Sequence, residues 1–276
     1  MDVSSACRTF IGHASALRWP DAVVTLNGLN MYEMLRALKA LDATDIASFN
    51  NALTPIRATV DAPRIDYALT VVQTSQLPAT VPAGLTPDQV VTARQFAASP
   101  SSIMQELIPR GLLPAFNVGL VAVNNAFMEH RFGAPRPTYS VNCQPVTNPT
   151  LSGRILSATV GPFNATGLDS AITSLRAVMT TVQTDQRLVY RALGTAGMLC
   201  VRYVRGSTTN ISNHSWGTAV DLTIDGVLDP RGNNQVQFGL QLIAPIFNAQ
   251  GWFWGAGFPT EDGMHFEAGQ ALAGGW

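Results

Sequence analysis

Between residues 168 and 193, apolar side chains recur at steps of mostly three and four, which is the spacing of one face of an amphipathic helix. Asp169 favours the N-terminal end of such a helix through the helix dipole, and Gly194 offers a C-terminal stop. A helix of this length must bury its apolar face, so we expect it to be a scaffold of the core. That face consists of Leu168, Ile172, Leu175, Met179, Val182, Val189 and Leu193.

The segments after this helix alternate between strand and helix patterns. The apolar run 198–201 and the alternating residues Val220, Leu222 and Ile224 predict two strands that flank a polar loop at 206–212. A further helix is expected at 237–249, followed by the aromatic run 252–254. Residues 139–162, rich in Thr, Val, Asn and Pro, predict loops with short strands.

The first part of the chain has mostly helical signals. Helical spacing of Met and Leu residues covers 29–41, a capping box with a first-turn proline opens a helix at 86–89, and a third helix is expected at 117–130. The Pro/Gly cluster 133–137 then predicts a domain boundary near residue 135. We therefore expect a mostly helical N-terminal domain of unknown role at 1–135 and a second domain at 136–276.

Composition and charge exclude several classes of protein. With 46% hydrophobic and 13% charged residues, the chain can bury a substantial core and is not a disordered protein. The formal net charge is −1 and the charges form no runs, so nucleic acid is not an expected partner. No transmembrane segment and no secretory signal is seen in the sequence.

The three cysteines, Cys7, Cys143 and Cys200, are far apart and odd in number. This spacing argues against a thiolate metal site and against a disulfide framework, so we interpret them as buried thiols. Burial is expected most strongly for Cys200, which lies in an apolar run.

Two of the four histidines lie in dense polar motifs in the last quarter of the chain, at 212–221 and 261–267. His214, Asp221 and His265 supply the three ligands that a catalytic zinc ion needs, with a fourth position left open. Gly217 and Ala219 are small enough to let the turn between the first two ligands fold back. A histidine beside tryptophans is also often a structural residue, so residue types alone indicate a metal only moderately.

These motifs resemble the signature of the zinc D-Ala-D-Ala carboxypeptidase family, SxHxxGxAxD followed by [ED]xxHFE. The family includes VanY-type carboxypeptidases, D,D-dipeptidases and phage L-alanyl-D-glutamate endopeptidase endolysins. The resemblance covers about residues 140–276 and implies Zn²⁺ and an α+β fold in which a small antiparallel sheet with helices carries the metal, as in hedgehog/DD-peptidase-like domains. The positions that match are Ser212, His214, Gly217, Ala219, Asp221, Asp262, His265, Phe266 and Glu267.

The resemblance also implies roles for the residues around the metal. The family places its general base three residues before the last ligand, which is Asp262 here. Aspartate at this position is frequent in the endolysin-like branch, so it favours an endopeptidase. Its neighbour Glu261 is one position off the motif and is expected to face solvent. Ser212 and Glu267 are expected to support the ligands rather than to bind the metal.

An arginine before the first motif would stabilise the oxyanion in this family, and the chain offers Arg202 and Arg205. On an extended strand the two would face opposite sides, so only one would reach the metal, and Arg202 is slightly favoured. Trp252 and Trp254 are expected in the core, with the lining of a substrate cleft as the functional alternative.

The expected function is hydrolysis of peptide bonds in peptidoglycan stem peptides, by an endopeptidase or a D,D/L,D-carboxypeptidase. The alternative is a catalytically inactive, zinc-stabilised module that binds the wall or has a structural role. A third possibility places the main activity in the N-terminal region, where we find little support for it. Without a signal peptide, the protein would be made in the cytoplasm and act in the cell-wall or periplasmic compartment after lysis or dedicated export.

Overall fold

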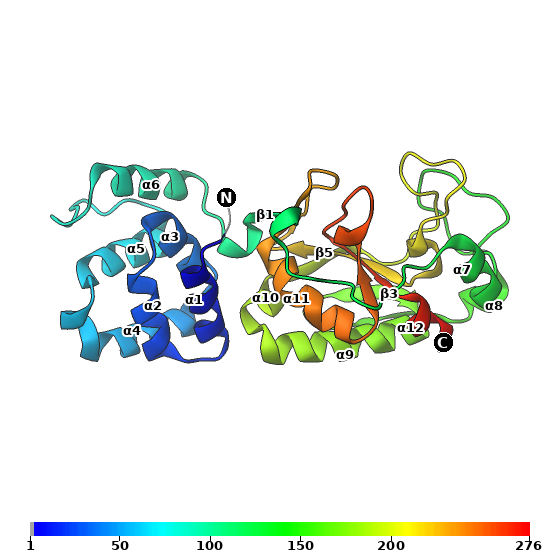
Figure 1. Ribbon diagram of the computed structural model, residues 1–276, viewed down its shortest axis with the longest axis horizontal. Helices are drawn as coiled ribbons and strands as arrows, with labels where there is room; N and C mark the ends of the chain where they lie inside the picture. Colours follow the sequence, from blue (N-terminus) through cyan, green and yellow to red (C-terminus); the bar gives the residue numbers. More distant parts are fainter. Residues whose placement is uncertain (1–2) are drawn as a thin grey trace. The chain divides into compact units, whose positions relative to one another are not determined.

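The computed structural model describes residues 3–276 and divides the chain into two compact units, Met1–Glu106 and Leu107–Trp276 (Figure 1). The division therefore falls between Glu106 and Leu107 and not near residue 135. Among the described residues, no helix combines the length and the apolar character that crossing a bilayer requires.

The N-terminal unit is helical, and its helices begin where the sequence supplies caps. Asn30 accepts a hydrogen bond from the Glu33 N–H at the start of α3, and Thr86 and Gln89 form the expected capping box of α6. The helices are α1 Ser5–Ser15, α2 Trp19–Asn27, α3 Met31–Lys39, α4 Ala43–Leu53, α5 Ala62–Thr74 and α6 Pro87–Ala98, with short 3-10 turns at Thr54–Thr59 and Ile103–Gln105.

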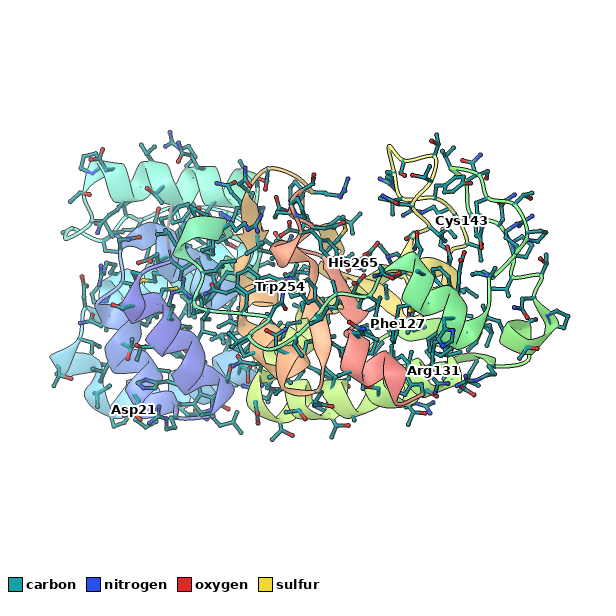
Figure 2. The ribbon with its side chains drawn as sticks, turned by 45° about the vertical axis from the view of Figure 1, so that its right-hand side comes forward. Asp21, Phe127, Arg131, Cys143, Trp254 and His265 are labelled. Carbon is teal, nitrogen blue, oxygen red and sulfur yellow. A yellow bond between two sulfur atoms is a disulfide. The ribbon has the colours of Figure 1, made fainter. Side chains whose placement is uncertain are left out.

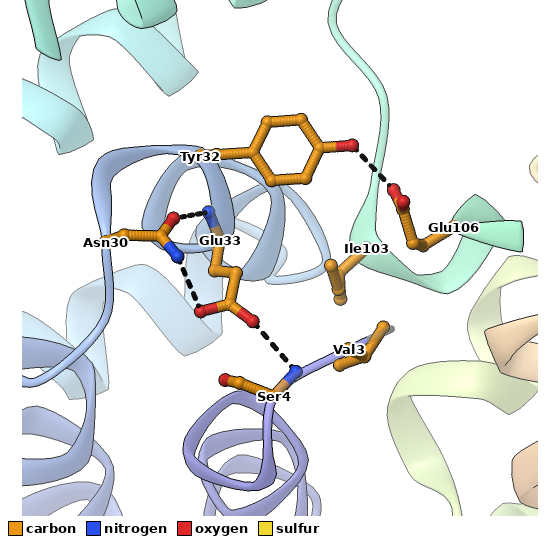
Figure 3. Close-up of a pocket in the computed structure, with 7 residues that line it drawn as sticks. All are labelled: Val3, Ser4, Asn30, Tyr32, Glu33, Ile103 and Glu106. Atoms are coloured by element: carbon orange, nitrogen blue, oxygen red, sulfur yellow. Dashed lines mark hydrogen bonds between the residues drawn. The ribbon is translucent and has the colours of Figure 1, made fainter. Parts of the chain in front are cut away.

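A pocket of about 160 Å³ in the N-terminal unit contains two carboxylates (Figure 3). Glu33 accepts hydrogen bonds from the Ser4 N–H at 2.9 Å and from Asn30 Nδ2 at 3.0 Å. Glu106 accepts a bond of 2.7 Å from the Tyr32 hydroxyl. Glu33 thus joins the start of α3 to the segment before α1, and Glu106 joins the end of the unit to α3. Both carboxylates therefore have a structural role.

The C-terminal unit is built on a five-stranded antiparallel sheet of order β4-β5-β9-β8, with β6 paired to β5. Helices α9, α10 and α11 lie together below the sheet in Figure 1. The α+β architecture with small antiparallel sheets agrees with the sequence expectation. The sheet strands are β4 Leu193–Gly197, β5 Ala219–Ile224, β6 Val227–Leu228, β8 Trp252–Trp254 and β9 His265–Ala268, and the helices are α7 Asn125–Phe132, α8 Pro149–Ser152, α9 Asp169–Asp185, α10 Arg187–Ala192, α11 Phe238–Ala249 and α12 Gln270–Gly274.

Two short ribbons complete the unit, β1 Leu107–Pro109 with β7 Gln235–Gln237, and β2 Ile155–Thr159 with β3 Asn164–Leu168. The β1–β7 pairing explains why the division falls before residue 107, since β1 completes a ribbon with a strand 128 residues later. Asn117 adds to this attachment, because its side chain accepts from the Trp254 N–H and donates to the Trp254 carbonyl, both at 2.9 Å, along the edge of β8.

Three elements differ from the sequence expectation. The long helix is interrupted at Gln186, whose φ of −132° and ψ of 51° are not helical, so its apolar face runs across α9 and α10. The strand expected at 198–201 is not formed: Leu193 and Gly194 belong to β4, which ends at Gly197, and within 198–201 only Val201 makes an isolated bridge. Residues 117–124 precede α7 without forming helix, because Asn124 supplies the cap one residue before Asn125.

The interpretation of the cysteines is wrong for two of the three. Cys143 and Cys200 form a disulfide with a Cα–Cα distance of 5.0 Å, and neither is buried. Their neighbours Gln144 and Val201 form an antiparallel bridge that brings the two segments together. This contact joins residues 57 positions apart, so no local spacing could indicate it. Cys7 is a buried free thiol, as expected.

Candidate metal centre

Three side chains from different segments of the C-terminal unit meet at one point. The Asp221 Oδ1 atom lies 3.2 Å from His214 Nε2 and 3.1 Å from His265 Nδ1, and the three candidate ligand atoms all lie within 4.8 Å of one another. His214 and His265 are buried and Asp221 is half-buried. Figure 2 shows His265 among the side chains of this unit.

Sheet register brings two of these residues together. β5 pairs with β9 so that Asp221 stands directly opposite His265, which places their side chains on the same face of the sheet. His214 comes from the 3-10 turn Asn213–Trp216, which ends at Gly217 with a φ of 66°. That left-handed residue turns the chain onto β5, and Ala219 is fully buried at the start of the strand.

The outer nitrogen of each imidazole is fixed by an acceptor. His214 Nδ1 lies 2.9 Å from the Met198 carbonyl oxygen, which can only accept, so Nδ1 carries the proton. His265 Nε2 lies 3.0 Å from Glu267 Oε2, which also accepts a bond of 2.7 Å from Asn213 Nδ2. The nitrogens facing Asp221 are then the ones free to bind a cation.

Electrostatics at this point favour a positive charge beside Asp221. Burial raises the pKa of Asp221, but the two histidines outweigh it and hold the pKa well below its usual range. Burial lowers the pKa of His265, but hydrogen bonds to Asp221 and Glu267 outweigh it and raise the pKa to about 10. A divalent cation could supply the charge that otherwise comes from a proton on His265.

Two of the three separations between the candidate ligand atoms fit a zinc site, and the third pair, the two histidine nitrogens, lies within 4.8 Å. Ligands about 2.0–2.1 Å from a tetrahedral zinc ion lie about 3.3 Å from one another, close to the separations of 3.1 and 3.2 Å on either side of Asp221 Oδ1. Two neutral imidazoles and one carboxylate form a donor set that suits this metal.

Asp262 lies beside the cluster, with its backbone carbonyl accepting a 3.1 Å bond from the His265 N–H. Its Oδ2 is 3.1 Å from Arg231 Nε, and its Oδ1 is buried without a hydrogen-bond partner among residues 3–276. Burial and the charge of Asp221 raise the pKa of Asp262, although His265 acts in the opposite direction. Arg231 was missed by sequence reasoning, because it lies in a turn outside both motifs.

The expectation that Glu261 faces solvent is wrong. Its side chain is buried and Oε2 accepts a 2.7 Å bond from the Asn234 N–H. Glu261 therefore ties the segment before Asp262 to the turn that carries Arg231.

Of the two candidate arginines, Arg202 is half-buried and Arg205 is exposed. Burial and the charge of Arg205 lower the pKa of Arg202, while the charges of Asp221 and Asp262 oppose this, so the guanidinium lies within electrostatic range of both carboxylates. The backbone at Arg202 forms a bend and not the expected strand. Arg202 is fixed there by bonds from its N–H to Ser215 Oγ at 3.1 Å and from Nη1 to the Tyr203 carbonyl at 3.0 Å.

Ser212 and the two tryptophans have structural contacts. Ser212 is buried, and its N–H donates to the Arg202 carbonyl at 3.0 Å, which joins the first motif to the arginine segment. Trp252 and Trp254 are 0% and 1% exposed, so they belong to the core and cannot line an open cleft. Trp254 stacks on Phe266, which supports β9 from the side of β8.

Residues 205–268 match the family model described as D-alanyl-D-alanine carboxypeptidase, which confirms the resemblance carried by the two motifs. The matched segment contains the three candidate ligands and Asp262, and it begins after Arg202. The match supports a hydrolase of the peptidase class. No curated protein and no solved structure matches the chain.

Proposed function

We propose that the C-terminal unit, whose residues 205–268 carry the D-alanyl-D-alanine carboxypeptidase family domain, is a zinc-dependent peptidase of peptidoglycan stem peptides. It would act as an endopeptidase or a D,D/L,D-carboxypeptidase in the cell-wall or periplasmic compartment. The observation that carries this proposal is the convergence of His214, Asp221 and His265 next to the half-buried carboxylate of Asp262, whose Oδ1 has no partner among the described residues.

In this proposal His214 Nε2, Asp221 and His265 Nδ1 hold the zinc ion. When bound, zinc would polarise the scissile carbonyl and lower the pKa of a water molecule towards neutrality. The Met198 carbonyl and Glu267 keep the two imidazoles in the tautomers that leave these nitrogens free.

The remaining chemistry falls to Asp262 and Arg202. The free Oδ1 of Asp262 would accept a proton from the attacking water and pass it to the leaving amine, a role favoured by its raised pKa. The Arg202 guanidinium would face the negative charge that builds on the carbonyl oxygen. Arg205 is exposed, so we assign the oxyanion role to Arg202 alone.

The test is incubation of the full chain with purified peptidoglycan and mass analysis of the released fragments. Asp262→Asn keeps the size of the side chain but cannot accept the proton, so turnover should fall by about 10²- to 10⁴-fold with zinc retained. Asp221→Asn removes ligand charge and should lower zinc content as well. Asp185→Asn, an exposed carboxylate at the end of α9, is the matched control.

If Asp262→Asn releases fragments at the wild-type rate, Asp262 is not the base. If the wild-type protein binds about one zinc ion per chain but releases nothing from several wall chemotypes, the peptidase proposal fails. That second result would favour the inactive, zinc-stabilised module.

A further inference from the structure

An ion pair joins the candidate base to an arginine that neither motif contains. Arg231 Nε lies 3.1 Å from Asp262 Oδ2, and the two side chains are 37% and 18% exposed. Only one carboxylate oxygen takes part, since Asp262 Oδ1 has no partner among the described residues. The arginine therefore restrains the carboxylate without occupying the oxygen that would accept the proton.

The segment Asp229–Gln237, which carries Arg231, is held in place by two buried carboxylates. Asp229 Oδ2 accepts a 2.5 Å bond from the Gln237 N–H, which closes the loop at its base. Glu261 binds the middle of the loop, through its carbonyl to the Gly232 N–H at 2.9 Å and through Oε2 to the Asn234 N–H at 2.7 Å. Both carboxylates are 1% exposed.

These contacts fix the loop to the residue next to Asp262. Burying the Asp229 and Glu261 carboxylates costs free energy, and each has one oxygen without a partner among residues 3–276. Tertiary packing thus holds two buried carboxylates at a cost in free energy. Their contacts with the loop keep the Arg231 guanidinium next to Asp262.

We propose that Arg231 is a positioning residue of the peptidase, which holds the Asp262 carboxylate so that Oδ1 points to the reacting water. This inference rests on the proposed function. An ion pair exposed to this extent contributes little to folding stability. A displacement of a catalytic group by about 1 Å can cost on the order of 10²-fold in rate. Loss of Arg231 should therefore affect turnover far more than stability.

The experiment compares Arg231→Gln, Arg231→Lys and Asp262→Asn, alone and combined, in the full zinc-loaded chain with peptidoglycan as substrate. Arg231→Gln should lower kcat by about 10- to 100-fold with KM, zinc content and Tm nearly unchanged. Arg231→Lys keeps the positive charge and can still donate a hydrogen bond to Asp262, so it should recover part of the loss. Arg176→Gln, an exposed arginine on α9, should match the wild type.

A double-mutant cycle separates positioning from direct contact with substrate. If Arg231 acts through Asp262, adding Arg231→Gln to Asp262→Asn should cause no further loss of kcat. An undiminished further loss, a change in KM alone or full activity of Arg231→Gln would each overturn the inference.

A measurement without substrate provides a second check. The Arg231 Nε–H signal in NMR spectra should shift in Asp262→Asn, and an unchanged signal would show that the ion pair is absent in solution. If wild-type protein releases no fragments, the proposed function fails and the inference fails with it. If the wild type is active while Arg231→Gln matches it, only the inference fails.

Discussion

Gly217 provides a test of how tightly the fold controls the metal centre. Its φ is 66°, and a Cβ atom added there would lie 2.7 Å from both Gly167 Cα and Leu168 N. An alanine in this backbone region costs about 1 kcal/mol. The clash with backbone atoms cannot be relieved by rotating a side chain and costs about 1–3 kcal/mol more. Gly217→Ala should therefore destabilise the protein by about 2–4 kcal/mol.

Gly226→Ala is the matched control, because Gly226 has a φ of 76° but no atom within 4 Å of the added Cβ. It should cost only about 1 kcal/mol. At about 2–4 °C per kcal/mol, Tm should fall by about 4–16 °C for Gly217→Ala and about 2–4 °C for Gly226→Ala.

The Gly217 substitution should also weaken zinc binding. The Gly217 N–H donates to the His214 carbonyl at 3.0 Å, so a displaced turn moves this ligand. Thermal unfolding and metal analysis of the two variants provide the measurement. Equal losses of Tm, or full zinc content in a strongly destabilised Gly217→Ala, would refute the reasoning.

Three further predictions concern other parts of the molecule. Cys143→Ser opens a disulfide between residues 57 positions apart and should destabilise the protein by about 4 kcal/mol in denaturant unfolding, with no further loss on adding reductant. Burial raises the pKa of Asp229 to about 7, so ionising this carboxyl costs folding free energy as the pH rises from about 4 to 7. Asp229→Asn should therefore be more stable than wild type near pH 8, with the advantage lost near pH 4, and an equal difference at both values would contradict this. A fragment of residues 107–276 should fold and bind zinc, whereas 136–276 lacks β1 and the Asn117 contacts and should be less stable by circular dichroism and metal analysis.

Local signals in the sequence were sufficient for the elements that carry the ligands. The alternation of Val220, Leu222 and Ile224 predicted β5, and the expected helix 237–249 matches α11 to within one residue. The two histidine motifs identified the three residues that the structure brings together. In each case the pattern lies within a short segment, so neighbouring residues carry the information.

Contacts between distant segments could not be predicted in this way. Tertiary packing determines the pairing of β1 with β7 and the ion pair between Arg231 and Asp262. Such contacts produce no periodic pattern in the sequence. The same reason explains Glu261, whose burial depends on a loop about 30 residues earlier. The independent folding of the two units and the catalytic roles of the site residues stay predictions.

The disulfide connects the segment that carries Arg202 to residues near Cys143. Whether this connection exists in a given molecule depends on the redox conditions that the molecule has met. Cys200 is two residues before Arg202, and its N–H donates to the His214 carbonyl at 3.0 Å. A chain made in a reducing cytosol would hold two thiols here, and they would pair only after the molecule reached an oxidising space. The oxidation state of this pair would then record which compartment a given molecule has entered. Mass spectrometry of the intact chain can read that record as the presence or absence of two hydrogen atoms.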